Sequence, residues 1–142
     1  MKRVLSISML VVFLAGLAFA TMAIAGEEET DAAKIAASSW VKLIDTDKYS
    51  ESWDQAAQLF KEHVTKEQWQ NALSQVRSPL GKLESRTLKS VYYTKTLPGV
   101  PDGDYVVIQY DTAFERKKSS VETVTPMKEK DGRWRVSGYF IK

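Results

Sequence analysis

The segment YVVIQYDTAF, residues 105–114, decides the fold class of this chain. Its apolar residues recur at every second position, which is the period of a β-strand with one buried face. The face expected to be buried carries Val106, Ile108, Tyr110 and Phe114, and the opposite face carries Tyr105, Val107, Gln109 and Asp111. A strand with one apolar face needs a second layer to cover it. The segment therefore predicts a sheet packed against another layer.

Three neighbouring segments also have the composition and period of strands, and the spacing predicts a four-stranded antiparallel meander. They span residues 83–97, 121–130 and 133–141, the last with Trp134, Val136 and Phe140 on one face. Asp131-Gly132 is a strong signal for a two-residue hairpin between the last two strands. Pro126 lies inside the third predicted strand and indicates a bulge or an edge position.

The chain before residue 83 has the helical period instead. A first helix is predicted over residues 31–46, a second begins after Ser50, and a third begins after Thr65, where Gln68 completes a capping box. The apolar stripes carry Ala33, Ala37, Trp40, Val41 and Ile44, then Trp53, Ala56, Ala57 and Phe60, then Trp69, Ala72, Leu73 and Val76. The predicted fold is α+β, with about three N-terminal helices packed on a curved four-stranded antiparallel sheet. Strands this long would curl into a cone with a mouth.

The first 25 residues have the pattern of a secretory signal peptide. Lys2 and Arg3 precede an apolar run, which ends at Ala23-Ile24-Ala25 and is followed by an acidic stretch that begins at Gly26. We therefore predict a signal peptide over residues 1–25 and one domain over 26–142. The expected location is the periplasm or the exterior of the cell, with membrane contact only during export.

The composition of the predicted domain argues against several classes of function. Without Lys2 and Arg3 the chain has 18 basic and 18 acidic residues, so a basic nucleic-acid surface is not expected. The chain has no cysteine, and its single histidine, His63, has no partner that the sequence identifies as an acid–base pair. The acidic residues near position 50 lack the glycine of a calcium loop. No catalytic residue, metal site or cofactor is predicted.

Several stretches resemble the bacterial family known as domain of unknown function 4019. They include YSESWD at 49–54, VTKEQW at 64–69, VRSPLG at 76–81, YVVIQYD at 105–111 and WRVSGY at 134–139. The resemblance covers nearly all of residues 31–142. It implies a small exported domain with the cone-like fold of the nuclear-transport-factor-like superfamily. It implies no activity and no catalytic residues.

Two groups of side chains are candidates for binding. The first would line a ligand pocket, because such pockets are largely aromatic with a few polar groups, and consists of Trp53, Trp69, Tyr110 and Trp134. The second would form an outer face for self-association into a homodimer, and consists of Tyr105, Val107, Tyr139 and Ile141. An apolar outer face is covered either by the chain itself or by a partner.

The leading functional hypothesis is an exported, non-enzymatic domain that binds an envelope protein or a small apolar ligand. The alternative is a small cofactor-free enzyme, similar to an isomerase or a dehydratase, that uses the cavity of the cone. Such an enzyme needs a carboxylate or a histidine inside the cavity beside a hydrogen-bond donor. Asp111 and Tyr110 are adjacent in one strand, so they point to opposite faces and do not form that pair.

Overall fold

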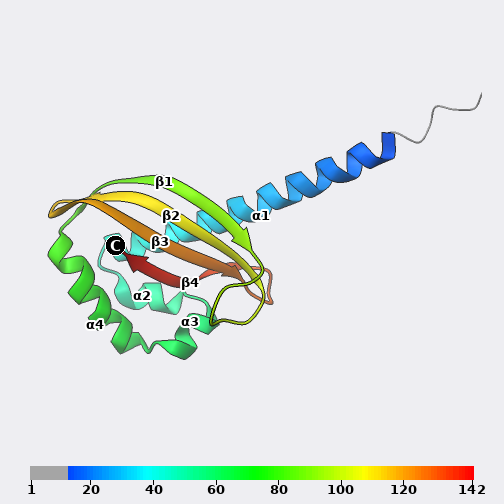
Figure 1. The fold of residues 1–142 in the computed structure, drawn as a ribbon. Coiled ribbons are helices and arrows are strands. Elements are labelled where there is room, and N and C mark those ends of the chain that lie inside the picture. Colours follow the sequence, from blue (N-terminus) through cyan, green and yellow to red (C-terminus); the bar gives the residue numbers. More distant parts are fainter. Residues whose placement is uncertain (1–12) are drawn as a thin grey trace, which may run out of the picture.

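The computed structural model describes residues 13–142, with side chains from residue 26 onward. The first helix, α1 (Phe13–Asp45), projects from the body of the molecule at its N-terminal end (Figure 1). It runs without a break through the predicted cleavage site after Ala25. Residues 1–12 of the predicted signal peptide lie outside the described residues, and its cleavage stays a prediction. Among the described residues, no helix combines the length and the apolar content that a membrane crossing requires.

The sheet contains β1 (Leu83–Thr94), β2 (Asp104–Phe114), β3 (Lys117–Lys128) and β4 (Trp134–Ile141). The strands are antiparallel and follow one another in the order β1-β2-β3-β4, as the meander predicted. They bend across the helices, which Figure 1 shows on one side of the sheet. The α+β fold with a four-stranded antiparallel sheet is therefore confirmed. Its membership of the cone-like superfamily stays a prediction.

The helices differ from the prediction at two places. The first helix was predicted over residues 31–46, but α1 already begins at Phe13. The segment expected to form a second helix is divided into α2 (Tyr49–Asp54) and α3 (Gln58–His63). Ala57 separates them because its backbone is extended and its N–H donates to the Val136 carbonyl of β4 at 2.8 Å. The next helix, α4 (Lys66–Arg77), begins at Thr65 with the predicted capping box and ends at a 3₁₀ turn, Ser78–Leu80.

A bulge in β4 reverses the faces expected for its last residues. Thr125 pairs with Gly138 and Pro126 pairs with Val136, so Ser137 has no opposite residue. Pro126 indicated a bulge or an edge position; the bulge is confirmed, whereas β3 is not an edge strand. Beyond the bulge the alternation shifts by one position. Tyr139 pairs with the buried Val124 and faces the helices, whereas Phe140 is 50% exposed. The predictions that Phe140 belongs to the core face and that Tyr139 and Ile141 belong to the outer face were wrong for this reason.

The core lies between the sheet and the helices α1, α2, α3 and α4. Every residue of the apolar stripe predicted for the first helix is buried, and so are Val106, Ile108, Tyr110 and Phe114 of β2. The two layers predicted from residues 105–114 are thus present. What the periodicity did not predict is a group of charged side chains buried in the same layer.

Candidate functional site

The four residues of the predicted ligand pocket do not surround a common cavity. Trp69 lines a groove between α4 and β4, whereas Trp134 and Trp40 line a different cleft. Trp53 packs against the core and donates its indole N–H to the Val64 carbonyl at 2.7 Å. Tyr110 is buried in β2, with the guanidinium of Arg86 5.8 Å from the centre of its ring.

An aromatic cluster fills the space where a central pocket was expected. It consists of Trp40, Phe60, Trp69 and Tyr139, whose rings lie 4.9 to 6.3 Å apart where they pair. The buried Ser52 holds two of them: its carbonyl accepts the Trp40 indole N–H and its hydroxyl oxygen accepts that of Trp69. Stacked and edge-to-face rings at these distances pack efficiently. The aromatic residues therefore serve as core.

A charged cluster lies beside the aromatic cluster and draws one residue from each of four elements. It consists of Asp45 at the end of α1, Arg77 at the end of α4, Arg86 in β1 and Glu122 in β3. Their side chains are between 0% and 13% exposed. Two positive charges meet two negative charges, so the cluster is neutral as a whole. Charges that are buried together in this way need both pairing and hydrogen bonds.

Glu122, at the centre of the cluster, has a hydrogen-bond donor on every side. Its Oε1 accepts from Arg86 Nε and from the Thr112 hydroxyl, both at 2.8 Å. Its Oε2 accepts from Arg86 Nη2 at 3.3 Å and from the Tyr139 hydroxyl. Burial and the charge of Glu122 raise the pKa of Tyr139 far above its usual range, so the hydroxyl stays protonated and donates.

Asp45 connects the two arginines and is the most exposed carboxylate of the cluster. It accepts from Arg77 Nη2 at 2.9 Å and from Arg86 Nη1 and Nη2 at 2.7 and 2.9 Å. Burial raises the pKa of Asp45, but the hydrogen bonds and charges of Arg86 and Arg77 outweigh burial and leave that pKa below its ordinary value. The carboxylate is therefore ionised at neutral pH and fully engaged by the chain.

Two smaller clefts approach these clusters from outside. A cleft of about 360 Å³ reaches Asp45 and Arg77 between the ends of α1 and α4, with Lys82, Glu115 and Arg116 on its walls. A groove of about 220 Å³ between α4 and β4 is mainly apolar. We call it the α4–β4 groove, and it is lined by Trp69, Ala72, Leu73, Val76, Tyr139, Phe140 and Ile141.

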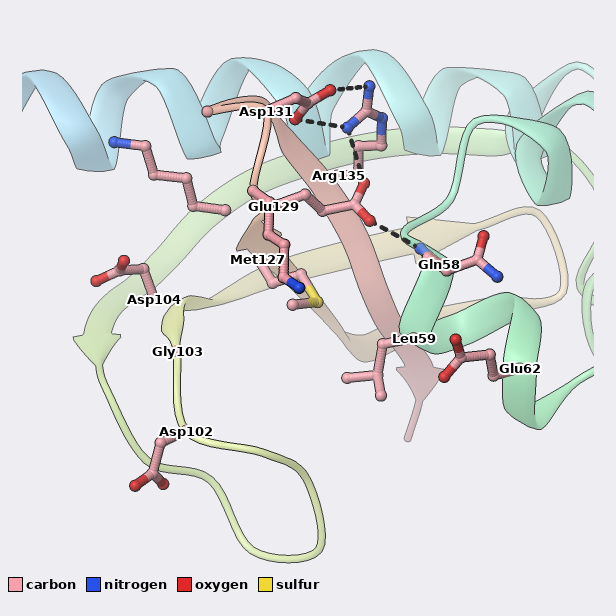
Figure 2. A pocket seen from close by; sticks show the side chains of 13 residues that line it. Gln58, Leu59, Glu62, Asp102, Gly103, Asp104, Met127, Glu129, Asp131 and Arg135 are labelled. Atoms are coloured by element: carbon pink, nitrogen blue, oxygen red, sulfur yellow. Dashed lines mark hydrogen bonds and ion pairs between the residues drawn. The ribbon is translucent and has the colours of Figure 1, made fainter.

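A larger cleft, of about 880 Å³, lies where α3 meets the hairpin between β3 and β4 (Figure 2). Three of its charged side chains are joined to each other: Arg135 contacts both Glu129 and Asp131, and Glu129 also accepts the backbone N–H of Gln58. These contacts hold the hairpin against α3. Within the part of the chain that the structure describes, no group of His, Cys, Asp or Glu side chains is placed to hold a metal ion.

The residues of the predicted self-association face lie on different sides of the sheet. Tyr105 is buried, and its hydroxyl donates to the Pro101 carbonyl of the loop before β2 at 2.6 Å. Val107 is half-buried and pairs with Tyr92, which is 65% exposed. Tyr139 and Ile141 pair with residues of the inner face, as the bulge requires.

The charged cluster is the feature that sequence reasoning missed. Tyr139 was predicted to lie on the outer face of the sheet, and no role was predicted for Asp45 or Arg86. A signal was present: Glu122 lies two residues before Val124, on the face that the alternation of β3 turns inward. A charge at a core position requires a partner of opposite sign, but the sequence does not say which arginine supplies it.

Comparison with known families agrees with the resemblance found in the sequence. The model of the family described as "Protein of unknown function (DUF4019)" matches residues 36–139. This range covers α2, α3, α4, β1, β2 and β3, the buried part of α1 from Ala37 onward, and β4 as far as Tyr139. The chain belongs to this family. No curated protein matches the chain.

Proposed function

We propose that the chain is exported and acts outside the cytoplasm as a non-enzymatic domain that binds a protein partner. Export is supported by the signal-peptide pattern of residues 1–25. A non-enzymatic role is supported by one observation above all: the two buried carboxylates of the interior are already hydrogen-bonded by other side chains. Glu122 accepts four hydrogen bonds and Asp45 accepts three, all from side chains of this chain.

The surface supports a protein partner better than an enclosed ligand. The aromatic cluster occupies the interior, whereas the α4–β4 groove is apolar and open, and Val76 and Phe140 beside it are 46% and 50% exposed. Exposed apolar side chains that gather in one place are typical of sites where proteins bind. A small apolar ligand is the competing occupant of this groove.

The proposal is tested by site-specific crosslinking in the envelope of the organism that makes the protein. A photoreactive phenylalanine replaces Val76 in the groove or, as the matched control, the exposed Tyr92 of β1. We expect a discrete protein–protein product from position 76 and none from position 92. Native mass spectrometry of the same protein, purified without detergent, checks the competing occupant. A retained small molecule, with no protein product from position 76, would overturn the proposal.

The alternative function is a cofactor-free isomerase- or dehydratase-like enzyme. The observation that favours it is the 360 Å³ cleft, because Asp45 and Arg77 lie at its inner end. A general base works best when its pKa lies near the operating pH, whereas the pKa of Asp45 is lowered. If a small molecule is retained, the Lys82→Ala variant identifies its location. Loss of the molecule in this variant would favour the alternative, and loss in Val76→Asp would place the molecule in the groove.

A further inference from the structure

The free edge of β4 is only partly covered by the chain. The backbone N–H groups of Val121 and Lys142 each donate to the carbonyl of the other residue, so the two form a hydrogen-bonded pair. Such pairs recur at every second residue of an antiparallel ladder, so Phe140 and Thr123 form the next one. The backbone N–H and C=O groups of Tyr139 and Ile141 therefore point away from β3. Nearer the start of the strand, the outward Val136 carbonyl accepts from Ala57. Among the described residues, nothing covers the edge at 139 and 141 in the same way.

The other edge of the sheet, β1, has the features that discourage strand addition. It has register shifts near Glu84 and near Lys89, and charged side chains lie along it. Bulges and lysines are the usual means by which proteins protect an edge. Beyond Ser137 the β4 edge has no further bulge, and the segment Val136–Ile141 (VSGYFI) contains no charge before Lys142. The β1 edge is therefore protected against the addition of a strand, whereas the β4 edge is not.

The helix beside the β4 edge is uncharged over the same length. α4 has charges only at its two ends, and residues 68–76 (QWQNALSQV) have none. A strand added to β4 would lie over this surface and lose contact with water there. A charged side chain on the added strand would be desolvated without a partner, which is costly. The complementary strand is therefore uncharged, and β4 itself is the edge strand of this chain that meets the condition.

We propose that the partner bound at this edge is a second copy of the chain, paired antiparallel to β4 about a two-fold axis at Phe140. Only this register uses the outward groups of both Tyr139 and Ile141, because Tyr139 of each copy then faces Ile141 of the other. Ile141 of one copy enters the α4–β4 groove of the other, beside Tyr139. The two sheets become one eight-stranded sheet. The inference rests on the proposed binding function and names its partner.

The register makes a sharp test possible, because the chain has no cysteine. Phe140 would face Phe140 of the second copy at a non-hydrogen-bonded position, where the two Cα atoms lie about 4.5 Å apart. This separation is within the range of a disulfide. Under mild oxidation, Phe140→Cys should form a covalent dimer at low protein concentration. The control, Tyr92→Cys, has a more exposed site on β1 and should stay monomeric.

A second variant removes the edge without disturbing β3. Ile141→Pro deletes an N–H that points away from β3, so the ladder within the sheet is retained. Two hydrogen bonds of the dimer are lost, one on each copy, and we expect the dissociation constant to rise about tenfold or more. Ile141→Ala is the control for the lost side chain. Sedimentation of the protein expressed from Met1 measures the equilibrium, and mass spectrometry records whether residues 1–25 remain.

The outcomes separate this inference from the proposed function. A dimer that Phe140→Cys traps and Ile141→Pro weakens supports the inference. A monomer at all accessible concentrations overturns it, and so does a dimer that Ile141→Pro leaves unchanged or that Tyr92→Cys traps equally well. If the inference fails while position 76 still crosslinks a different protein, the binding function stands with another partner. If position 76 crosslinks nothing, the binding function fails as well.

Discussion

The interior of this protein has two halves, one aromatic and one charged, and they are stabilised differently. In the aromatic cluster, burial and close packing of Trp40, Phe60 and Trp69 stabilise the fold. This kind of packing tolerates small changes in the angles between the rings. In the charged cluster, the pair of Arg86 and Glu122 stabilises the fold only if their hydrogen-bonding groups find partners. Tyr139 belongs to both halves, because its ring packs on Trp40 and its hydroxyl binds Glu122. The first half forms a core, and the second determines how the helices and the sheet align.

Removal of Glu122 should be the most damaging single change to this arrangement. Glu122→Ala leaves two buried arginines with only Asp45 as a counter-charge. Breaking a buried ion pair in this way costs about 3–5 kcal/mol of unfolding free energy. Urea unfolding at neutral pH, followed by tryptophan fluorescence, measures the loss.

A double variant separates charge imbalance from lost packing. Glu122→Leu combined with Arg86→Met removes one charge of each sign and leaves Asp45 paired with Arg77. Because no uncompensated charge remains, we expect this protein to be more stable than Glu122→Ala. If the double variant loses as much stability as the single one, the pairing argument is wrong and the cluster acts through its shape.

The corresponding change in the aromatic half is Trp69→Ala. It removes a ring that contacts Trp40, Phe60 and Tyr139 and leaves the Ser52 hydroxyl without that donor. Deletion of a buried aromatic side chain costs about 3–5 kcal/mol. We expect the lower part of this range, because Trp69 also lines the open α4–β4 groove. Thermal and urea unfolding test this, and a loss of less than about 1 kcal/mol would contradict the core assignment.

Tyr139→Phe disconnects the two halves and keeps the ring in place. Glu122 loses one donor and Arg77 loses an acceptor at 3.4 Å, so the expected cost is about 1–3 kcal/mol. Tyr105→Phe is the matched control, because its hydroxyl binds only the carbonyl of a loop residue. We expect the control to lose less stability. Equal losses would show that the hydrogen bond of Tyr139 within the charged cluster contributes no more to stability than an ordinary buried hydrogen bond.

The sequence predicted those parts of the fold that local signals specify. The alternation in residues 105–114 predicted the core face of β2, and Thr65 with Gln68 predicted the start of α4. Pro126 predicted a bulge because a central strand cannot use a residue without an N–H. These signals act over a few residues, so one sequence is enough to detect them.

The rest depended on contacts between distant residues. Pro126 did not reveal that Ser137, on the neighbouring strand, is the extra residue, and so the faces of Tyr139 and Phe140 were exchanged. Asp45 and Arg86 are 41 positions apart and meet only when α1 crosses the sheet. Pairing at such a separation follows from the topology, which a local pattern cannot supply.

The smallest change in stability is expected from two aspartates that each bind arginine. One of them, Asp45, is buried, and the other, Asp131, is exposed. The pKa of Asp45 is lowered because the contacts of Arg86 and Arg77 outweigh burial, and hydrogen bonds from Arg135 and from the backbone of Arg133 lower the pKa of Asp131 to about 2. A folded pKa below the unfolded value near 3.8 stabilises the protein above that pH. This stability is lost as the pH falls through the folded pKa.

Both replacements by asparagine should therefore flatten the acid side of the stability curve, but to different extents. Asp45→Asn removes an electrostatic contribution to stability. Salt screens this contribution weakly, because the Asp45 side chain is only 13% exposed. Asp131→Asn should change the curve little, and 0.5 M salt should abolish the difference, because the Asp131 side chain is 49% exposed. Urea unfolding between pH 5 and pH 2, with and without salt, measures both. Equal flattening by the two variants would mean that burial does not strengthen the charged cluster, and that the two halves of the interior differ less than their geometry implies.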